Sequence, residues 1–464
     1  MKVPSALIDS LIETKGFDKE AFEKVHQSGE QITSVRFNAQ KPVDQSTIFS
    51  VENNTEAIAF SSVPWNANGY YLSSRPSFTT DPLFHGGAYY VQEASSMFLE
   101  EAIRQSIDLS QPLRVLDLCA APGGKSTLLQ SVISDKSILV SNEVIKSRVT
   151  VLSENIIKWG AANVVVTNND PKDFQRLQGY FDLIVVDAPC SGSGLFRKDP
   201  RAVNEWSEQS VEMCCHRQQR ILADILPTLK DGGTLIYSTC SYSPMEDEDI
   251  SDWLINDFGL ESISFQLKNE WNIIETTASI SRAKGYRFYP DKLKGEGFFI
   301  AAFRKENLSG LEKRDLNVKG KSERLTSKEI EVVKPWIDKW DNFFFIKQKE
   351  EVIAVPLYLE KDLAILQSAL YIKKAGVKLG VIIRSELIPD HELALSNIIN
   401  PLIAGIEVDK STALEYLRKQ DINIETNYKG WILLTYQQIK LGWIKLLSNR
   451  INNYYPKEWR IVNK

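Results

Sequence analysis

The feature that most constrains this chain is a short apolar stretch that runs into a loop of small residues. Residues 115–118 read Val-Leu-Asp-Leu, and the loop that follows reads Cys-Ala-Ala-Pro-Gly-Gly-Lys over residues 119–125. Residues 125–133 then carry their apolar side chains on one helical face. A strand, a tight loop and a helix in this order predict an α/β unit whose ligand binds beyond the end of the strand.

Further apolar stretches repeat this pattern along the chain. They predict strands at residues 137–141, 164–166, 183–186, 235–237 and 298–303. Helical segments separate most of them, and strands separated by helices imply a parallel sheet with helices on both faces. The predicted fold class is therefore α/β.

The regions on either side of this sheet have a different character. The first 110 or so residues are helical at first and then rich in turn signals. Residues 304–328 are polar and charged, which is typical of a linker, whereas residues 343–346 and 352–357 predict short strands. Since 464 residues suffice for about three domains, we expect a small β-rich or mixed domain to follow the linker.

Composition restricts the class of protein. Apolar residues make up 43% of the chain and charged residues 25%, as in an average soluble globular protein. Asp9 and Glu13 interrupt the start where a signal peptide needs an apolar run, and no stretch is long and apolar enough to span a membrane. The five cysteines include no CxxC pair, so neither a disulfide framework nor a zinc site is indicated. We expect a cytoplasmic protein with reduced thiols, no membrane partner and no metal.

Charge is distributed unevenly along the chain. The net charge of −5 by itself argues against a nucleic-acid partner. Residues 282–329, however, hold 13 Lys and Arg against 7 acids, and residues 410–464 hold 10 against 4. Both stretches also carry aromatic residues, a combination that can contact phosphates and bases. For either stretch alone, a solvated face beside core aromatics is an equally good interpretation.

Acidic residues close four successive predicted strands. Asp117 lies in the first, Glu143 follows the second, Asp170 the third and Asp187 the fourth. Glu143 has about the spacing from the loop at which an acid meets ribose hydroxyls, and Asp170 could meet an adenine amino group. Any one of them alone is more often a helix cap or turn residue. Together they predict a pocket for a nucleoside-containing cofactor, and the lack of a GxGxxG motif disfavours a dinucleotide.

Two cysteines follow neighbouring predicted strands. Cys190 lies in the motif DAPCSGSG, and Cys240 lies in STCSYSP. Neighbouring strands are about 5 Å apart, so we expect both thiols to face one crevice. A lone cysteine is usually a small buried apolar residue. We interpret the remaining three in this way: Cys119, Cys214 and Cys215.

In chain order, the motifs DLCAAPGGK, NE, ND, DAPCSGSG and STCSYSP resemble those of the Sun-type RNA cytosine-C5 methyltransferases, which use S-adenosylmethionine. The resemblance covers residues 90–305, including Gln-Glu-Ala-Ser-Ser at 92–96. Five ordered matches of this length are not a chance event. The layout also resembles the RsmF-like branch, which modifies 16S ribosomal RNA. Its support is Val-Pro-Trp at 63–65, the GEGFF segment at 295–299 and Leu-Gly-Trp at 441–443.

The resemblance implies covalent catalysis on the cytosine ring. Carbon 5 of cytosine is a poor nucleophile, and a thiolate that adds to carbon 6 makes it reactive. The resemblance assigns the nucleophile to Cys240, product release to Cys190, and a hydrogen bond to ring N3 to Asp187. The target base must be unstacked for the thiol to reach it.

The resemblance also implies which residues bind S-adenosylmethionine. The positive sulfonium of this cofactor suits a pocket lined with acids. Lys125 could orient the substrate, and an ion pair at the helix start is an equal alternative. The expected cofactor-binding residues are Cys119, Ala120, Ala121, Pro122, Gly123, Gly124, Lys125, Glu143, Arg148, Asp170 and Asp187.

With the resemblance, the chain divides into four predicted parts. These are an N-terminal RNA-binding segment (1–85), a Rossmann-like class I methyltransferase domain (86–305), a linker (306–330) and a C-terminal PUA-like RNA-binding domain (331–464). Arg36 lies in a segment that resembles an RNA-contact motif, so it would touch phosphate, unless it is an ordinary surface arginine. One departure is Asp291, because many relatives have His there.

Three alternatives remain open at this point. Transfer RNA is the main competing substrate. A DNA cytosine methyltransferase would use the cysteine after proline, Cys190, as its nucleophile. A catalytically silent RNA-binding assembly factor could keep the fold, although intact Cys190 and Cys240 speak against it. We predict a monomeric enzyme that methylates carbon 5 of cytosine in small-subunit ribosomal RNA, free or within the assembled subunit.

Overall fold

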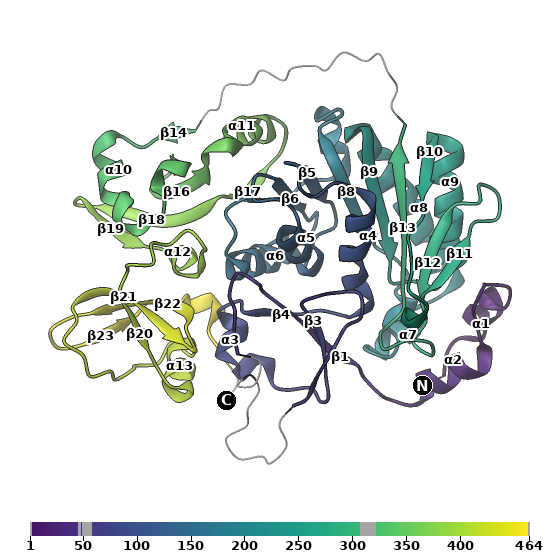
Figure 1. Cartoon of the computed structure of the whole chain (residues 1–464), viewed down its shortest axis with the longest axis horizontal. Helices are drawn as coiled ribbons and strands as arrows, with labels where there is room; N and C mark the ends of the chain where they lie inside the picture. Colours follow the sequence, from purple (N-terminus) through teal and green to yellow (C-terminus); the bar gives the residue numbers. More distant parts are fainter. Residues whose placement is uncertain (1, 45–47, 49–57, 307–321, 463–464) are drawn as a thin grey trace.

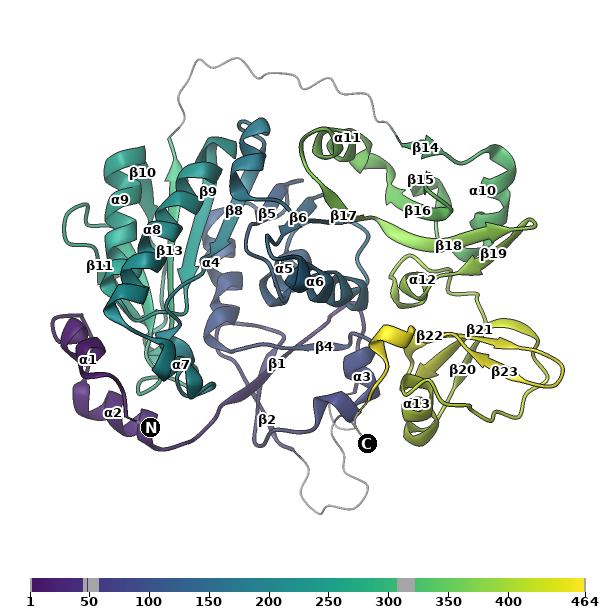
Figure 2. The same ribbon diagram turned by 180° about the vertical axis from the view of Figure 1, so that it is seen from behind.

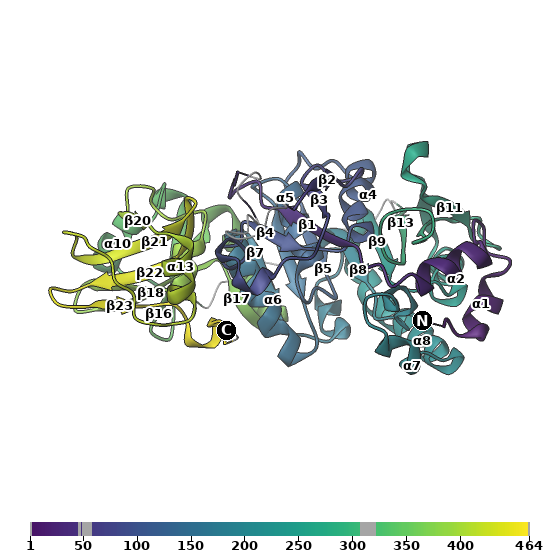
Figure 3. The same ribbon diagram turned by 90° about the horizontal axis from the view of Figure 1, so that it is seen from below.

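The computed structural model describes residues 2–44, 48, 58–306 and 322–462. Seen from below, two N-terminal helices, a large central sheet with its helices, and small β-rich units lie in a row (Figure 3). No helix within the described residues is long and apolar enough to cross a membrane. The predicted linker falls largely on residues 307–321, which lie outside the described residues.

The central sheet contains five parallel strands in its middle, in the order β7-β6-β5-β8-β9. Their bounds are Arg114–Asp117 (β5), Ile138–Asn142 (β6), Val164–Thr167 (β7), Phe181–Asp187 (β8) and Leu229–Thr239 (β9). From β5 the chain adds β6 and β7 on one side and then returns to the other side of β5 for β8 and β9, which creates the switch point at which α/β sheets bind ligands.

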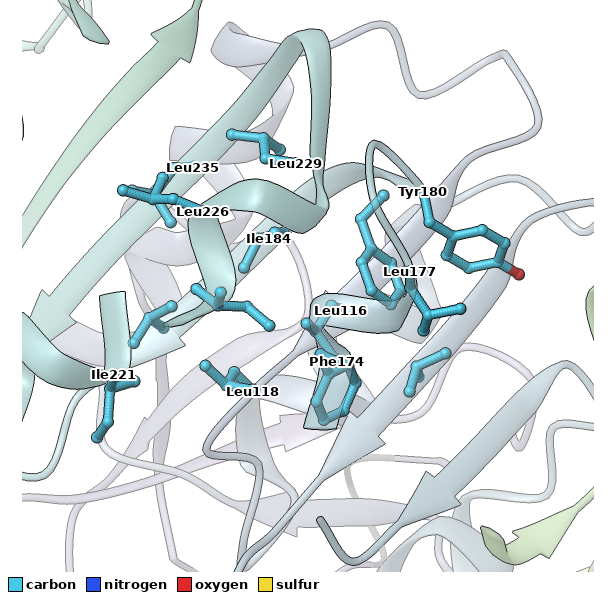
Figure 4. Close-up of a cluster of buried hydrophobic side chains, with 14 of the residues drawn as sticks. Leu116, Leu118, Phe174, Leu177, Tyr180, Ile184, Ile221, Leu226, Leu229 and Leu235 are labelled. Carbon is cyan, nitrogen blue, oxygen red and sulfur yellow. The ribbon is translucent and has the colours of Figure 1, made fainter. Parts of the chain in front are cut away.

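Helices cover both faces of these parallel strands, as the sequence predicts. Leu116, Val140 and Ile184 point into one core, part of which Figure 4 shows. Their neighbours Leu139 and Val185 point into the other core, because alternate strand residues face opposite sides. The first core is closed by α8 (Glu208–Ile225) and α9 (Glu248–Phe258). The second is closed by α4 (Leu99–Ser106), α5 (Gly124–Val132) and α6 (Lys146–Trp159).

The sheet is mixed rather than parallel throughout, which corrects the prediction. The last predicted strand, now β13 (Phe298–Lys305), runs antiparallel to β9. Three further strands lie on the same side of the sheet: β10 (Leu260–Ile263), β11 (Ile274–Thr277) and β12 (Lys284–Phe288). Their short, partly polar sequences carry little strand signal of their own, because strand formation depends on the packing of neighbouring strands.

The N-terminal region forms a small sheet that the turn-rich sequence did not predict. Its strand order is β2-β3-β1-β4. All five residues of β1 are buried, so the alternation that marks a half-exposed strand is missing. The strands are β1 (Thr33–Phe37), β2 (Phe60–Ser62), β3 (Gly69–Leu72) and β4 (Tyr89–Val91); the preceding helices are α1 (Ser5–Leu11) and α2 (Lys19–Gln27), and α3 (Pro82–His85) precedes β4.

The C-terminal region consists of two β-rich units, each with its own core. The first contains the sheet β14-β15-β16-β18-β19, and the second contains β20-β21-β22-β23. The strands of the first unit are Glu323–Arg324, Phe343–Gln348, Glu351–Pro356, Val377–Ile383 and Glu386–Pro389. Those of the second are Gly405–Glu407, Gly430–Tyr436, Ile439–Leu446 and Ile451–Asn453.

Four helices accompany these units. They are α10 (Ser327–Val333), α11 (Glu360–Ala369), α12 (His391–Leu395) and α13 (Lys410–Leu417). Helix α10 begins before position 331, where the sequence analysis begins the C-terminal domain. The Thr326 side chain caps it, which explains why a charged segment starts a folded element there.

The first C-terminal unit packs directly against the central sheet. Strand β17 (Ile372–Ala375) pairs antiparallel with β7 and so extends the sheet (Figure 2). Side chains of α11, such as Leu363 and Leu366, enter the same core as the parallel strands. The side-chain carboxylate of Asp362 accepts hydrogen bonds from Arg114 and Tyr180, each at 2.7 Å.

Candidate active site

The loop after β5 brings backbone close to the predicted cofactor position. Gly123 has φ +119°, a left-handed conformation that side chains rarely adopt, and it caps the start of α5. The side chains of Arg148 and Asn155 on α6 donate hydrogen bonds to the carbonyls of Ala121 and Pro122, at 2.7 and 2.8 Å. The loop is therefore held in place from behind while the N–H groups that begin α5 remain available to a ligand.

Two buried acids lie beside this loop. Asp117 is fully buried, and burial raises its pKa to about 7. One of its carboxylate oxygens accepts a hydrogen bond from Ser126 at 2.7 Å, and the other has no hydrogen-bond partner among the described residues. Glu143, 3% exposed, accepts from the backbone N–H of Ile145 and lies 3.4 Å from Arg148. Two acids at the ends of neighbouring strands suit a ligand that carries hydroxyl groups and a positive charge.

The exposed apolar side chains next to Glu143 complete a surface suited to a nucleoside. Val144 is 53% exposed and Ile145 48%, although both follow directly on a buried strand end. Asn168 donates hydrogen bonds from its side chain to the carbonyls of Glu143 and Val144, at 2.6 and 3.0 Å. The residues present therefore fit a ligand with a flat base, a ribose and a positive charge.

Asp170, the acid after β7, is engaged as a helix cap. Its carboxylate accepts a hydrogen bond from the backbone N–H of Lys172 at 3.2 Å. The Asp173 carboxylate in turn accepts one from the backbone N–H of Asp170. Arg220 on α8 lies 3.5 Å from the same carboxylate. Asp170 therefore has the helix-capping role that is the common alternative for an acid at this position.

Lys125 at the start of α5 and Asp187 at the end of β8 form an ion pair. Their charged atoms are 2.7 Å apart, and the other Asp187 oxygen accepts from the Ser238 hydroxyl at 2.8 Å. Burial alone lowers the pKa of Lys125, but the charges of Asp187, Asp117 and Cys240 raise it on balance. The ion-pair alternative for Lys125 is thus present in the structure, and its ammonium lies among the groups predicted to react.

The two predicted cysteines meet at the ends of neighbouring strands. Asp187 of β8 is in register with Ser238 of β9, and each cysteine follows a few residues later. The sulfur atoms of Cys190 and Cys240 are 3.1 Å apart, and both residues are partly exposed. The sequence predicts this proximity, because each cysteine follows one of two neighbouring strands.

The environment distinguishes the two thiols. The hydrogen bond with Cys240, burial and the charges of Cys240 and Glu246 all raise the pKa of the Cys190 thiol well above its ordinary value. Either sulfur can be the donor in the contact between the two thiols. The charge of Cys240 is among those that raise the pKa of Lys125, so the Lys125 ammonium interacts with Cys240 and the Glu246 carboxylate with Cys190.

A buried carboxylate that sequence reasoning missed joins the two cysteine loops. Glu246 is fully buried and accepts hydrogen bonds from Ser191 and Ser241, the residues that follow the two cysteines. Gln218 on α8 donates to the same carboxylate at 3.1 Å. The only sequence signal is its place six residues after Cys240, which cannot indicate a partner 55 residues earlier.

A second buried network braces the Cys240 segment from behind. Arg287 on β12 is 1% exposed and pairs with Asp247 at 3.1 Å and with Glu248. Asp247 also accepts from the Thr239 hydroxyl at 2.6 Å, and Arg287 donates to the carbonyl of Tyr242 at 2.7 Å. The ends of the segment that contains Cys240 are therefore fixed by one guanidinium.

Glycines permit the loops of this half to approach one another. A Cβ on Gly194 would lie 2.6 Å from the carbonyl oxygens of both Cys240 and Gly297. A Cβ on Gly297 would lie 2.3 Å from the Tyr242 ring, which also packs against Phe22 of α2 with ring centroids 5.0 Å apart. The N-terminal helices and the GEGFF segment thus close around the Cys240 loop.

The Gln-Glu-Ala-Ser-Ser motif joins the N-terminal region to the GEGFF segment. The Glu93 carboxylate accepts from the backbone N–H groups of Ser95, Ser96 and Glu296, each at 2.9 Å. Ser95 donates its hydroxyl to the carbonyl of Glu296 at 3.0 Å. This motif therefore acts as a connector between the two regions.

The structure corrects the interpretation of Arg36. Its side chain is 2% exposed, so it neither lies on the surface nor reaches a phosphate. It donates to Gln92, to Thr127 and to the carbonyl of Gly124, and it stacks on Trp159. Arg36 links the N-terminal sheet to the cofactor loop, which basic character and sequence context alone could not indicate.

The remaining residues singled out by sequence have packing roles. Cys119 is partly buried against the same core as Leu118, and Cys215 on α8 points into that core. Asp291, the departure from the family pattern, has a nearly buried side chain that lies 3.1 Å from Lys292.

Comparison with known families matches three parts of this chain. Residues 105–304 match the family described as 16S rRNA methyltransferase RsmB/F. Residues 3–94 match the N-terminal domain of 16S rRNA methyltransferase RsmF, and residues 404–461 match the methyltransferase RsmF PUA domain. The second β-rich unit of the C-terminal region is therefore the part that is similar to a PUA domain.

Individual relatives match over most of the chain. A Ribosomal RNA small subunit methyltransferase F from Shewanella woodyi is 30% identical over 85% of this chain and 84% of its own length. The protein of the same name from Aliivibrio fischeri is 32% identical over 85% of each chain.

Solved structures are similar over part of this chain. A methyltransferase homolog protein from Pyrococcus horikoshii has 27% identity and a TM-score of 0.50, with 65% of this chain and all of the other covered. NSun6 from the same organism, solved with SFG, has 20% identity and a TM-score of 0.54, with 65% and 98% covered, and supports the fold alone.

Proposed function

Because this chain belongs to the RsmB/F family of 16S rRNA methyltransferases, we propose that it methylates carbon 5 of a cytosine in 16S ribosomal RNA through a covalent bond to Cys240. The chain is an S-adenosylmethionine-dependent RNA methyltransferase. The cytosine, the covalent step and the roles of individual residues are the content of the proposal.

The chemistry requires a nucleophile that activates the ring. The thiolate of Cys240 adds to carbon 6 of the cytosine, which makes carbon 5 nucleophilic. Carbon 5 takes the methyl group, for which S-adenosylmethionine is the electrophilic donor. Transfer of the carbon 5 proton to solvent water then lets the bond between carbon 6 and the Cys240 sulfur break, which releases the methylated base and the thiolate.

The single observation that carries this assignment is the contact between the two thiols at the ends of neighbouring strands. The sulfur atoms of Cys190 and Cys240 are 3.1 Å apart, and the Lys125 ammonium interacts with the charge of Cys240. The hydrogen bond with Cys240, burial and nearby negative charge raise the pKa of the Cys190 thiol, which supports a role for Cys190 as a proton donor that assists departure of the Cys240 sulfur. A DNA-type enzyme would instead use Cys190 as the nucleophile, and trapping of the adduct separates the two assignments.

The other predicted residues take complementary roles. Asp187 binds ring N3 of the cytosine and is oriented by Lys125 and Ser238. Glu143 binds the ribose hydroxyls of the cofactor and is oriented by Arg148. Asp170 accepts a hydrogen bond from the adenine amino group through a carboxylate lone pair that the helix cap does not use. The loop residues Cys119, Ala120, Ala121, Pro122, Gly123 and Gly124 hold the rest of the cofactor through close backbone approach.

The remaining regions are proposed to bind the RNA. The N-terminal segment (1–85) and the C-terminal region (331–464) flank the methyltransferase domain (86–305). The chain acts as a monomer in the cytoplasm, on RNA that is free or assembled in the small subunit. A base must leave its stack to enter the crevice, so an exposed loop of the RNA is the expected target.

A trapping experiment tests the covalent step. The Cys190→Ala variant, mixed with 16S ribosomal RNA and S-adenosylmethionine, is expected to accumulate a protein–RNA adduct that survives denaturing gel electrophoresis. Cys240→Ala is expected to form none. An adduct from Cys240→Ala and none from Cys190→Ala would reverse the assignment.

Bisulfite mapping tests the substrate. Cellular RNA from strains with and without this protein should differ at one or more cytosines of 16S ribosomal RNA and at none in transfer RNA. Loss of methylation in transfer RNA alone would support the competing substrate. Unchanged methylation in both, together with intact RNA binding, would support an inactive assembly factor.

A further inference from the structure

The buried carboxylate of Glu246 has no part in the reaction steps above, yet it touches both cysteine loops. We propose that Glu246 is a positioning residue that holds the Cys190 and Cys240 loops together, so that the two sulfur atoms face the target base as a pair. This inference rests on the proposed function for the identity of the nucleophile. Its geometric content does not depend on that function.

Four hydrogen bonds converge on the Glu246 carboxylate. One oxygen accepts from the backbone N–H of Ser191 at 2.9 Å and from the side-chain amide of Gln218 at 3.1 Å. The other oxygen accepts from the hydroxyls of Ser191 and Ser241, at 2.5 and 2.6 Å. Ser191 and Ser241 adjoin the two cysteines in sequence, so one carboxylate fixes the residue after each sulfur.

The arrangement favours a carboxylate over a neutral amide. Glu246 is fully buried, and an ionised carboxylate accepts several bonds while donating none. The backbone N–H of Ser191 and the amide of Gln218 can only donate, and they share one carboxylate oxygen. An amide would keep its oxygen for these two donors, but it would replace the charge-assisted bonds from the two hydroxyls by weaker neutral ones, and these bonds join the two loops.

Supporting residues hold Glu246 itself in place. The Tyr237 hydroxyl on β9 lies 2.7 Å from the backbone carbonyl of Glu246 and 3.0 Å from the side-chain oxygen of Gln218. Gln218 also donates to the carbonyl of Pro189, directly before Cys190. Hydrogen bonds from β9 and from α8 thus hold Glu246 in place, and support of this kind keeps a site within its productive geometry.

The position of the charge adds a second effect. Glu246 is one of the groups that raise the pKa of Cys190, after the hydrogen bond with Cys240, burial and the charge of Cys240. Lys125 on α5, which forms an ion pair with Asp187 of β8, interacts with the charge of Cys240. Removing the Glu246 charge should therefore lower the pKa of the Cys190 thiol.

The test compares Glu246→Gln with Asp249→Asn as a matched control. Asp249 is an exposed acid three residues later on α9, so its variant loses one negative charge of the same chain segment. Each full-length protein, free of RNA, is treated with limiting iodoacetamide at several pH values from 6 to 9. Mass spectrometry then gives the alkylation rate at Cys190 and at Cys240.

Glu246→Gln is expected to raise the alkylation rate of Cys190 relative to Cys240 and to shift the Cys190 profile toward lower pH. The kcat for RNA methylation should fall about 100-fold, because displacement of a reacting group by about 1 Å costs that much. The KM for S-adenosylmethionine should stay within about twofold, since its pocket lies beyond other strands. Asp249→Asn should match the native protein in every measurement.

An unchanged alkylation ratio in Glu246→Gln, with kcat close to that of Asp249→Asn, would overturn the proposal. If Glu246→Gln does not fold, Ser241→Ala decides, because it removes one donor and should shift the same ratio with a roughly fivefold loss of kcat. Failure of Cys190→Ala to trap RNA would overturn the proposed function instead. The alkylation ratio is measured without RNA and separates the two failures.

Discussion

The cofactor half and the base half of the active site lie along one sheet edge but are built differently. At the ends of β5, β6 and β7, several site contacts join neighbouring residues, such as Glu143 with Ile145 and Arg148, and Arg36 adds a long-range contact to the cofactor loop. At the ends of β8 and β9, contacts join segments far apart in the chain, such as Ser191 with Glu246. Contacts close in sequence therefore contribute to the first half, whereas the second half is held by contacts that only the tertiary structure provides.

The difference follows from what each half must do. A cofactor loop needs a left-handed glycine and free N–H groups at a helix start, which a few consecutive residues supply. A pair of thiols must be placed within a few ångströms of one ring atom, which requires rigid support from several directions. Arg287 and Glu246 provide that support from the interior of the protein.

Loss of the nucleophile should separate the two halves most clearly. Cys240→Ala is expected to lower kcat by a factor of about 10,000 or more, because the ring is no longer activated. The affinity for S-adenosylmethionine, measured by calorimetry, should be unchanged. A large loss of cofactor affinity in this variant would mean that the two halves are not independent.

Loss of the buried guanidinium should affect stability through the base half. Arg287→Met leaves the carboxylates of Asp247 and Glu248 without their partner and is expected to lower the free energy of unfolding by about 3–5 kcal/mol. Urea unfolding, followed by tryptophan fluorescence, measures the change. Replacement of the exposed Arg201, which pairs with Asp199, is the control and should cost less than about 1 kcal/mol.

A substitution in the cofactor half should show the reverse pattern. Glu143→Gln is expected to weaken S-adenosylmethionine binding about 10- to 100-fold, because a charged acceptor for hydroxyl groups is lost. In the Cys190→Ala background, trapping of RNA at saturating cofactor should persist. Unchanged cofactor affinity would contradict the proposed role of Glu143.

The smallest expected effect concerns the pH dependence of stability. Burial raises the pKa of Asp117 to about 7, so between pH 4 and 7 the folded protein holds a proton that the unfolded chain releases. Stability from this group is therefore present at low pH and is lost as the pH rises through about 7. Asp117→Asn should gain stability relative to the native protein over this range, by at most about 1.4 kcal/mol per pH unit. Urea unfolding at pH 5 and pH 8 measures the change, and a constant difference would contradict it.

Sequence reasoning was most successful where structure is local. The parallel strands, the small-residue loop and the acid after each strand have signals within a few residues, and the structure has them in that order. The same reasoning missed β1 and β12, because a strand buried on both sides has no alternation to detect. It also treated Arg36 as an RNA contact or a surface residue, since burial depends on helices and strands that arrive from elsewhere.

The amino-acid sequence by itself determined the α/β class, the small-residue loop after β5 and the presence of a cysteine after each of two neighbouring strands, because strand periodicity and turn chemistry act between near neighbours. Only the tertiary structure decided that the two sulfur atoms touch, that one carboxylate joins their loops, and that the C-terminal region extends the central sheet. These features bring together groups that are 50 to more than 200 residues apart in the chain. Long-range contacts of that kind form only when a whole core excludes water, which no local pattern encodes.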